Sequence, residues 1–233
     1  MNIDNIKSVY FVGAGGIGMS ALIRYFLSKG KKVAGYDKTP SDLTEQLNRE
    51  GADIHYEDNI DLIPGVYKNT DDTLVVYTPA IPATHSELRY FQTQGFEVMK
   101  RARVLGEITN CTKGLCVAGT HGKTTTSSML GITMLEKDPC IVVGGIIPEI
   151  GSNSRVGNSE YFIAEADESD NSFLYLTPSY SIVTNVEADH LENHGSYENI
   201  KKSFEEFIDK TSDIVVLNKD CHEIEKLNLK NKN

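Results

Sequence analysis

The sequence lacks the features that mark membrane, secreted and metal-binding proteins. No apolar run approaches the length of a membrane span, and the N-terminal residues lack the apolar core of a signal peptide. The four cysteines form no C-x-x-C pair, a pattern typical of reduced thiols in a cytosolic protein rather than of a metal site. We therefore expect a cytoplasmic protein that has no membrane partner.

A concentrated positive charge is also missing. The chain has 23 Lys and Arg residues against 33 Asp and Glu residues, a net charge of -10, and no basic block. Because nucleic-acid surfaces usually need such a block, we expect no nucleic-acid partner, although a local basic pocket for phosphates is compatible with this charge. The 233 residues correspond to one or two domains.

Strand-like and helix-like patterns alternate along the first half of the chain. Strands are expected at residues 8–12, 32–36 and 73–77, and helices at residues 18–27, 43–50 and 86–94, with Ser41 as the N-cap of the second helix. This alternation predicts an α/β fold with a parallel sheet covered by helices.

A second unit of the same class begins near residue 113. Its strands are expected at residues 114–118, 140–143, 161–164, 181–184 and 214–217, and its helices at residues 124–135 and 197–209. We place the domain boundary so that residues 1–109 form the first domain and residues 110–233 the second.

The most informative motif is Gly-Thr-His-Gly-Lys-Thr-Thr-Thr at residues 119–126, between an expected strand and an expected helix. Glycines let backbone N–H groups approach an anion, and a helix N-terminus favours negative charge. Lys123 would reach the outer phosphates of a nucleotide, and Thr124 would offer its hydroxyl to Mg²⁺. The expected phosphate-binding residues are Gly119, Thr120, His121, Gly122, Lys123, Thr124 and Thr125.

The match to the G-x-x-x-x-G-K-[ST] pattern is partial, because Val117 stands where the pattern needs a glycine. The alternative is an ordinary turn whose glycines only reverse the chain. The lysine, the threonine and the helix all fall in the required context, which favours the phosphate site. We also expect Lys123 to be an exposed loop side chain that contributes little to packing.

A second glycine loop lies near the N-terminus. Residues 13–18, Gly-Ala-Gly-Gly-Ile-Gly, fit G-x-G-x-x-G between a strand and a helix, and Asp37 ends the next strand at about the expected spacing. This pattern is typical of a site for any ligand that carries a pyrophosphate, of which NAD is one candidate. A tight turn without a ligand is the alternative.

Acidic residues follow two strands of the second unit. Glu165 begins the run Glu-Ala-Asp-Glu-Ser-Asp after one strand, and His190 ends a run that follows another. Residues beyond the carboxyl ends of parallel strands line the ligand crevice, so we expect both side chains to converge on the phosphates held by Lys123. A carboxylate suits Mg²⁺, whereas an imidazole is a less usual ligand for it. A solvated loop and a structural histidine are the alternatives.

Taken together, these segments resemble the Mur ligase family. The resemblance rests on residues 13–20, 118–126, 165–170 with Ser-Phe-Leu at 172–174, and 184–191, which stand in the family's order. The phosphate loop is shared by all Mur ligases. The N-terminal glycine loop and the acidic run resemble the branch that adds alanine.

The resemblance implies an ATP-dependent ligase of peptidoglycan precursor synthesis. Such an enzyme phosphorylates the carboxylate of UDP-N-acetylmuramate, and the amine of L-alanine then displaces the phosphate. The first domain would be Rossmann-like and bind the UDP sugar, and the second would be a P-loop-type α/β domain that binds ATP and Mg²⁺. The residues implied to contact the UDP sugar are Gly13, Gly15, Gly16, Ile17, Gly18, Asp37, Thr78 and Ala80.

The resemblance also implies roles for the residues of the second domain. Lys123 would steady the transferring phosphoryl group, Thr124 and Glu165 would bind one Mg²⁺, and His190 would bind a second. Lys123, Glu165 and His190 are therefore the expected catalytic residues. Family members continue into more of the ATP domain and an amino-acid-binding domain, so we expect a fragment that does not ligate alone.

Three other functions fit part of the pattern. A tripeptide ligase of the same family would share the nucleotide chemistry, and a non-catalytic module would bind the UDP sugar without turnover. An NAD(P) oxidoreductase would explain the first glycine loop but would leave Lys123 and the acidic run without a role. The sequence predicts no particular oligomeric state.

Overall fold

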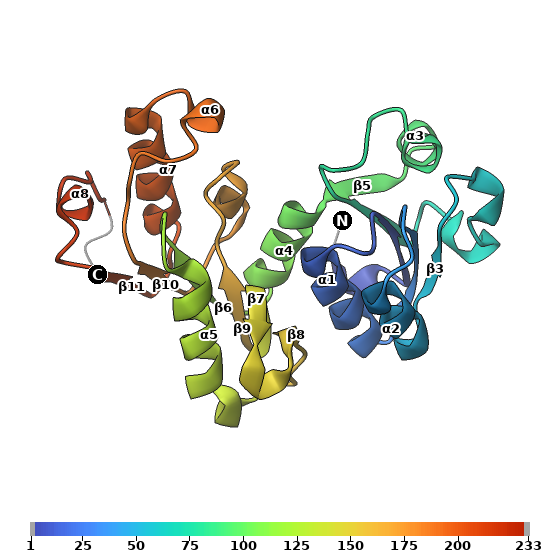
Figure 1. Ribbon diagram of the computed structural model, residues 1–233, viewed down its shortest axis with the longest axis horizontal. Helices are drawn as coiled ribbons and strands as arrows, with labels where there is room; N and C mark the ends of the chain where they lie inside the picture. Colours follow the sequence, from blue (N-terminus) through green and yellow to red (C-terminus); the bar gives the residue numbers. More distant parts are fainter. Residues whose placement is uncertain (1–2, 231–233) are drawn as a thin grey trace. The chain divides into compact units, whose positions relative to one another are not determined.

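The computed structural model describes residues 3–230, and the chain divides into two compact units, residues 1–104 and 105–233 (Figure 1). The division falls inside helix α4 (Arg101–Asn110), which the sequence patterns did not predict. The domain boundary expected after residue 109 stays a prediction.

The first unit is built on a parallel sheet with the strand order β3-β2-β1-β4-β5. The strands are β1 (Ser8–Val12), β2 (Lys32–Tyr36), β3 (Asp53–His55), β4 (Thr73–Tyr77) and β5 (Glu97–Lys100). Val12 pairs with Tyr36 on one side and with Tyr77 on the other, so the three central strands end together. In such a sheet, ligands bind beyond these carboxyl ends, where the strand order reverses.

The helices of the first unit are α1 (Ile17–Ser28), α2 (Asp42–Glu50) and α3 (Ser86–Thr93), with short 3₁₀ turns at Ile3–Asn5, Ile60–Leu62 and Gly65–Tyr67. The predicted N-cap of α2 is confirmed. Ser41 Oγ accepts the Thr44 N–H at 3.2 Å, and Thr44 Oγ1 accepts the Ser41 N–H at 2.9 Å. This reciprocal capping box fixes the start of the helix.

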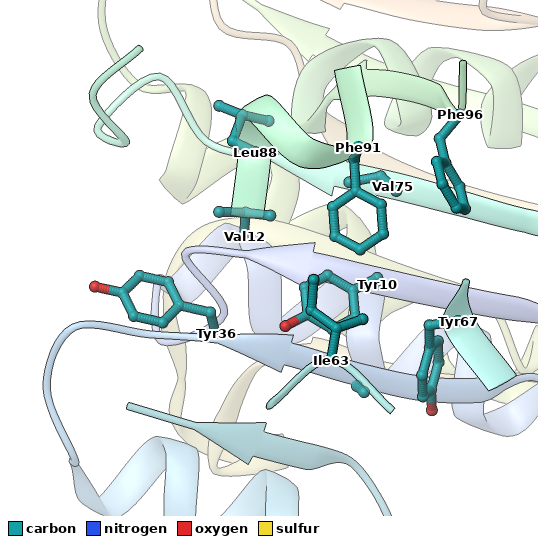
Figure 2. Packing of buried hydrophobic residues seen from close by; sticks show 10 residues of the cluster. Tyr10, Val12, Tyr36, Ile63, Tyr67, Val75, Leu88, Phe91 and Phe96 are labelled. Atoms are coloured by element: carbon teal, nitrogen blue, oxygen red, sulfur yellow. The ribbon is translucent and has the colours of Figure 1, made fainter. Parts of the chain in front are cut away.

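Aromatic side chains dominate the core on the α3 face of this sheet (Figure 2). The ring centroids of Tyr10 and Phe91 are 4.9 Å apart, and those of Phe91 and Phe96 are 5.0 Å apart in an edge-on arrangement. Ile63 and Tyr67, from the segment between β3 and β4, pack in the same cluster. Burial of such rings supplies much of the hydrophobic stabilisation of a small sheet.

A buried polar cluster adjoins this core. The Tyr10 hydroxyl donates to Glu87 Oε2 at 2.7 Å and lies 2.7 Å from His55 Nε2, while the Asn59 N–H donates to Glu87 Oε1 at 3.1 Å. Glu87 is 0% exposed, and this burial raises its pKa to about 7. Burial also lowers the pKa of His55, because a charged group loses its hydration there.

The second unit has a sheet with the strand order β11-β10-β6-β9-β7-β8. The strands are β6 (Lys113–Ala118), β7 (Cys140–Ile147), β8 (Ser152–Arg155), β9 (Tyr161–Glu165), β10 (Tyr180–Val183) and β11 (Ile214–Leu217). All neighbours run parallel except β7 and β8, which are antiparallel. Strand β8 was missed by the sequence patterns. The order places β6 between β10 and β9, so loops that follow these three strands share one edge.

The helices of this unit are α5 (Lys123–Thr133), α6 (Leu191–His194), α7 (Tyr197–Asp209) and α8 (His222–Glu225), with short 3₁₀ turns at Leu135–Lys137, Pro148–Ile150 and Ser172–Tyr175. Helix α7, predicted with these bounds, buries Phe204 and Phe207 against Phe173, with ring centroids 5.2 and 5.1 Å away. Within residues 3–230, no helix has the length and apolarity needed to cross a bilayer.

Candidate functional site

The phosphate loop joins the end of β6 to the start of α5. Gly119 has a φ of 140° and Gly122 a φ of 81°, values that favour glycine at both positions. The N-cap of α5 is Gly122, which contributes no side chain, and the first turn of the helix carries no acidic residue. The N-terminus of α5 is therefore suited to an external anion.

The segment after β10 holds this loop in place. The Asn185 amide forms two bonds with the backbone of His121, accepting its N–H at 2.8 Å and donating to its carbonyl at 3.0 Å. Thr184 Oγ1 donates to the same carbonyl at 2.7 Å, and Thr120 Oγ1 accepts the Glu187 N–H at 2.9 Å. Asn185 was not predicted as a site residue, although it directly follows a predicted strand.

Thr124 and Glu165 meet at the carboxyl end of β9. The Thr124 hydroxyl lies 2.9 and 3.0 Å from the two carboxylate oxygens of Glu165. The Gly144 N–H, in the middle of β7, donates to Glu165 Oε2 at 2.7 Å and orients the carboxylate. Hydroxyl and carboxylate oxygens are the donor types that Mg²⁺ prefers, so this pair fits the predicted metal ligands.

Lys123 is not the exposed loop side chain that the sequence predicts. Its Nζ lies 2.7 Å from Glu168 Oε2 and donates to the Gly119 carbonyl at 2.8 Å. The Lys123 side chain is 15% exposed and that of Glu168 only 4%. The expectation was wrong because a buried carboxylate from the loop after β9 lies beside the lysine. Glu168 belongs to the acidic run, and this was the signal that could have identified it.

His190 lies in the segment that follows β10, directly before α6. It is the N-cap of α6 and has a φ of 52°, and its ring nitrogens lie 3.7 Å from Glu192 and 3.9 Å from Asp189. In the described part of the chain, no hydrogen bond or ion pair joins His190 to Thr124 or Glu165. Residues 3–230 also contain no cluster of three His, Cys, Asp or Glu side chains arranged for a metal. The role expected for His190 stays a prediction.

The N-terminal glycine loop occupies the corresponding edge of the first sheet. The Gly13 N–H donates to the Tyr36 carbonyl at 2.8 Å, and the Gly15 N–H donates to Asp37 Oδ2 at 2.6 Å. A Cβ on Gly15 would lie 2.9 Å from Asp37 Cγ, so the close approach of loop and carboxylate requires glycine. Asp37, which directly follows β2, therefore holds the loop in place.

Two further residues lie beside the glycine loop and the start of α1. A Cβ on Gly13 would collide with the methyl group of Thr78, which places Thr78 directly beside the loop. A Cβ on Gly18 would lie 2.9 Å from Arg101 Nη1, so a guanidinium adjoins the first turn of the helix. Gly16 and Ile17 are exposed there, and Ala80 is exposed beyond β4. Arg101 was not predicted, although it directly follows β5 at the same edge.

Both halves of the chain match the models of known protein domains. Residues 8–112 match the domain described as the Mur ligase family catalytic domain, and residues 117–233 match the Mur ligase middle domain. The second match covers half of the chain. The chain belongs to the Mur ligase family. In this Mur ligase the N-terminal glycine loop and the phosphate loop thus lie in two different family domains.

Two curated relatives with high identity to this Mur ligase carry the same name. UDP-N-acetylmuramate–L-alanine ligase of Parabacteroides distasonis is 60% identical over 211 residues, which are 89% of this chain and 46% of the relative. The enzyme of the same name from Flavobacterium johnsoniae is 52% identical over 215 residues, 91% of this chain and 48% of the relative. The chain spans about half the length of the curated relatives it matches.

Solved structures show the same fold. A UDP-N-acetylmuramate-alanine ligase from Thermotoga maritima superposes with a TM-score of 0.81 at 30% identity, over 94% of this chain and 51% of that one. A UDP-N-acetylmuramate:L-alanyl-gamma-D-glutamyl-meso-diaminopimelate ligase from Neisseria meningitidis gives a TM-score of 0.83 at 22% identity, over 95% and 74%. At that identity the second likeness shows the fold alone.

Proposed function

We propose that this Mur ligase chain is the UDP-sugar-binding and ATP-binding part of an enzyme that joins L-alanine to UDP-N-acetylmuramate. The observation that carries the proposal is the convergence of Lys123, Thr124 and Glu165 at the N-terminus of α5, where a nucleotide phosphate would lie. The names of relatives that are 60% and 52% identical support the choice of substrates.

In this proposal the second unit binds ATP. The backbone of residues 119–122 and the N-terminus of α5 receive the phosphates, and Lys123 places a positive charge beside the transferring group. Thr124 and Glu165 would hold Mg²⁺, which supplies further neutralisation of phosphate charge when it is bound. Asn185 keeps the loop in its binding conformation through its two bonds to His121.

The proposed reaction has two steps. A carboxylate oxygen of UDP-N-acetylmuramate attacks the γ-phosphorus of ATP, the bond to the β-phosphate oxygen breaks, and ADP leaves. The L-alanine nitrogen then attacks the acyl carbon, loses a proton, and inorganic phosphate leaves. The residues described here act mainly by positioning the phosphates and stabilising their charge, which dominates catalysis of phosphoryl transfer.

The first unit binds the UDP sugar in this proposal. Its diphosphate would lie against the glycine loop and the N-terminus of α1, with the Arg101 guanidinium beside Gly18 as a counter-charge. Asp37 holds the loop through Gly15 and stands at the end of β2, where a nucleotide-binding sheet presents its ribose contact. We place the activity in the cytoplasm, where both nucleotides are available.

Calorimetric titration of the 233-residue chain tests the proposal. We expect UDP-N-acetylmuramate and MgATP to bind independently, each with a stoichiometry of one, and NADH not to bind. Binding of NADH in place of the UDP sugar would favour an oxidoreductase. Absence of binding for both nucleotides would contradict the proposed function.

A further inference from the structure

The ammonium group of Lys123 has its hydrogen-bonding capacity filled by the protein itself. Nζ lies 2.8 Å from the Gly119 carbonyl, 3.4 Å from the Thr120 carbonyl, and 3.0 and 2.7 Å from the two oxygens of Glu168. An ammonium has three N–H donors, and each of these three residues takes one. A phosphate oxygen can therefore reach Lys123 only by replacing one of these acceptors.

Glu168 is held in place for this contact. Its backbone carbonyl lies 2.9 Å from Nε2 of the buried His194, and the Asn193 amide donates to the Ser169 carbonyl at 2.9 Å. Helix α6 thus clamps the loop on which Glu168 stands. Over residues 3–230, Lys123 is the only side chain that pairs with the Glu168 carboxylate, which is almost fully removed from water.

We propose that Glu168 is an internal competitor of the nucleotide, which binds Lys123 when no phosphate is present and is displaced when a polyphosphate arrives. A buried carboxylate without its cation is costly, so displacement subtracts from the binding free energy of the phosphate. Glu168 therefore lowers the affinity of the loop for nucleotides, and it pairs with Lys123 again when the product leaves. This inference rests on the proposed ATP site.

The substitution Glu168→Gln tests the competition directly. Glutamine keeps the shape of the side chain but lacks the charge, so losing its contact with Lys123 costs less. We expect the Kd values of MgATP and of inorganic tripolyphosphate to fall about tenfold, because displacing glutamine from Lys123 costs less free energy than displacing glutamate. We also expect acylation of Lys123 by an amine-reactive ester, without nucleotide and read by mass spectrometry, to become several-fold faster.

The matched control is Asp170→Asn. It removes one carboxylate charge two residues away, on an exposed side chain, and its amide oxygen can still accept the Ser172 N–H. We expect both Kd values and the Lys123 acylation rate to stay within about twofold of the original chain, because charge alone acts weakly at an exposed position. A gain in affinity equal to that of Glu168→Gln would overturn the assignment to this side chain.

The outcomes separate the inference from the proposed function. MgATP binding by the original chain, with equal or weaker binding by Glu168→Gln, overturns the competition and leaves the ATP site standing. If neither the original chain nor the Glu168→Gln variant binds MgATP, both the competition and the proposed ATP site are overturned. If Glu168→Gln does not fold, Glu168→Leu serves in its place, since an apolar side chain fills the buried space without an acceptor, and the same gains are required.

Discussion

Replacing Glu87 with glutamine is expected to stabilise the first unit at neutral and alkaline pH. Glu87 is fully buried against Tyr10, His55 and Asn59. Glutamine can keep both hydrogen bonds, because its amide oxygen accepts the Asn59 N–H and its amide nitrogen donates to the Tyr10 oxygen. The Tyr10 hydroxyl then donates to His55 Nε2, which lies 2.7 Å away.

The size and sign of the effect follow from the pKa of Glu87. Burial raises that pKa from 4.5 to about 7, so the folded protein keeps a proton that the unfolded chain loses above pH 4.5. The contribution of Glu87 to stability therefore falls as the pH rises from 4.5 to 7. A shift of this size corresponds to about 3 kcal/mol. The variant should match the original chain near pH 4 and exceed it by about this amount at pH 8.

Buried histidines of the first unit affect the pH dependence in the opposite direction. Burial lowers the pKa of His55, and it also lowers the pKa of His85, a buried histidine whose Nδ1 lies 3.3 Å from Asp58. Each histidine contributes stability that is lost as the pH falls below its ordinary value of 6.5. The pH profile of one protein alone would therefore mix opposing effects. The difference between the variant and the original chain isolates Glu87, because both proteins retain the histidines.

Urea unfolding followed by circular dichroism between pH 4 and pH 8.5 measures this difference. Glu45→Gln, on the exposed face of α2, is the matched control and should shift the midpoint little at any pH. A Glu87→Gln variant that is no more stable than the original chain at pH 8 would refute the reasoning. A difference that is constant across the pH range would refute the assignment to this carboxyl group.

Three other substitutions test the sites and the fold. Gly15→Val places a side chain where a Cβ would already lie 2.9 Å from Asp37, so we expect UDP-N-acetylmuramate binding to weaken by roughly tenfold or more while MgATP binding is kept, as calorimetry would show. Lys123→Met leaves Glu168 buried without its cation and should cost about 3 kcal/mol in urea unfolding, most of which Lys123→Met combined with Glu168→Gln should recover. If Lys123→Met lowered the stability equally in the original chain and in the Glu168→Gln variant, the result would contradict an interaction between the two side chains. Ser41→Ala removes the capping box of α2 and should cost about 1 kcal/mol without affecting the affinity of either nucleotide; a change in affinity would argue against a purely local role.

The regular elements could be predicted where the local pattern was strong. The bounds expected for β1, β2, β4, β11 and α7 are confirmed, because these strands are short apolar runs and α7 repeats its apolar residues at helical spacing. Strands β3, β5 and β8 were missed. They contain only three or four residues, and their extended form depends on pairing with a neighbouring strand.

The candidate site was predictable in its loops but not in its contacts. The glycines, Lys123 and Thr124 lie in one short segment whose spacing carries the chemistry. The pairing of Lys123 with Glu168 joins residues 45 positions apart, and it requires β9 to lie beside β6. The position of Arg101 beside Gly18 has the same origin, since the two meet only because separate strands end at one edge of a sheet.

The sequence by itself determined the α/β class, the two glycine loops and the family, because these depend on residues close together in the chain. Only the tertiary structure decided which acidic side chain pairs with Lys123, that Asp37 braces Gly15, and that Glu87 is buried beside His55. The physical reason is that the charge state and accessibility of a side chain depend on its neighbours in space. Those neighbours are set by the order and register of the strands, which no local pattern of residues contains.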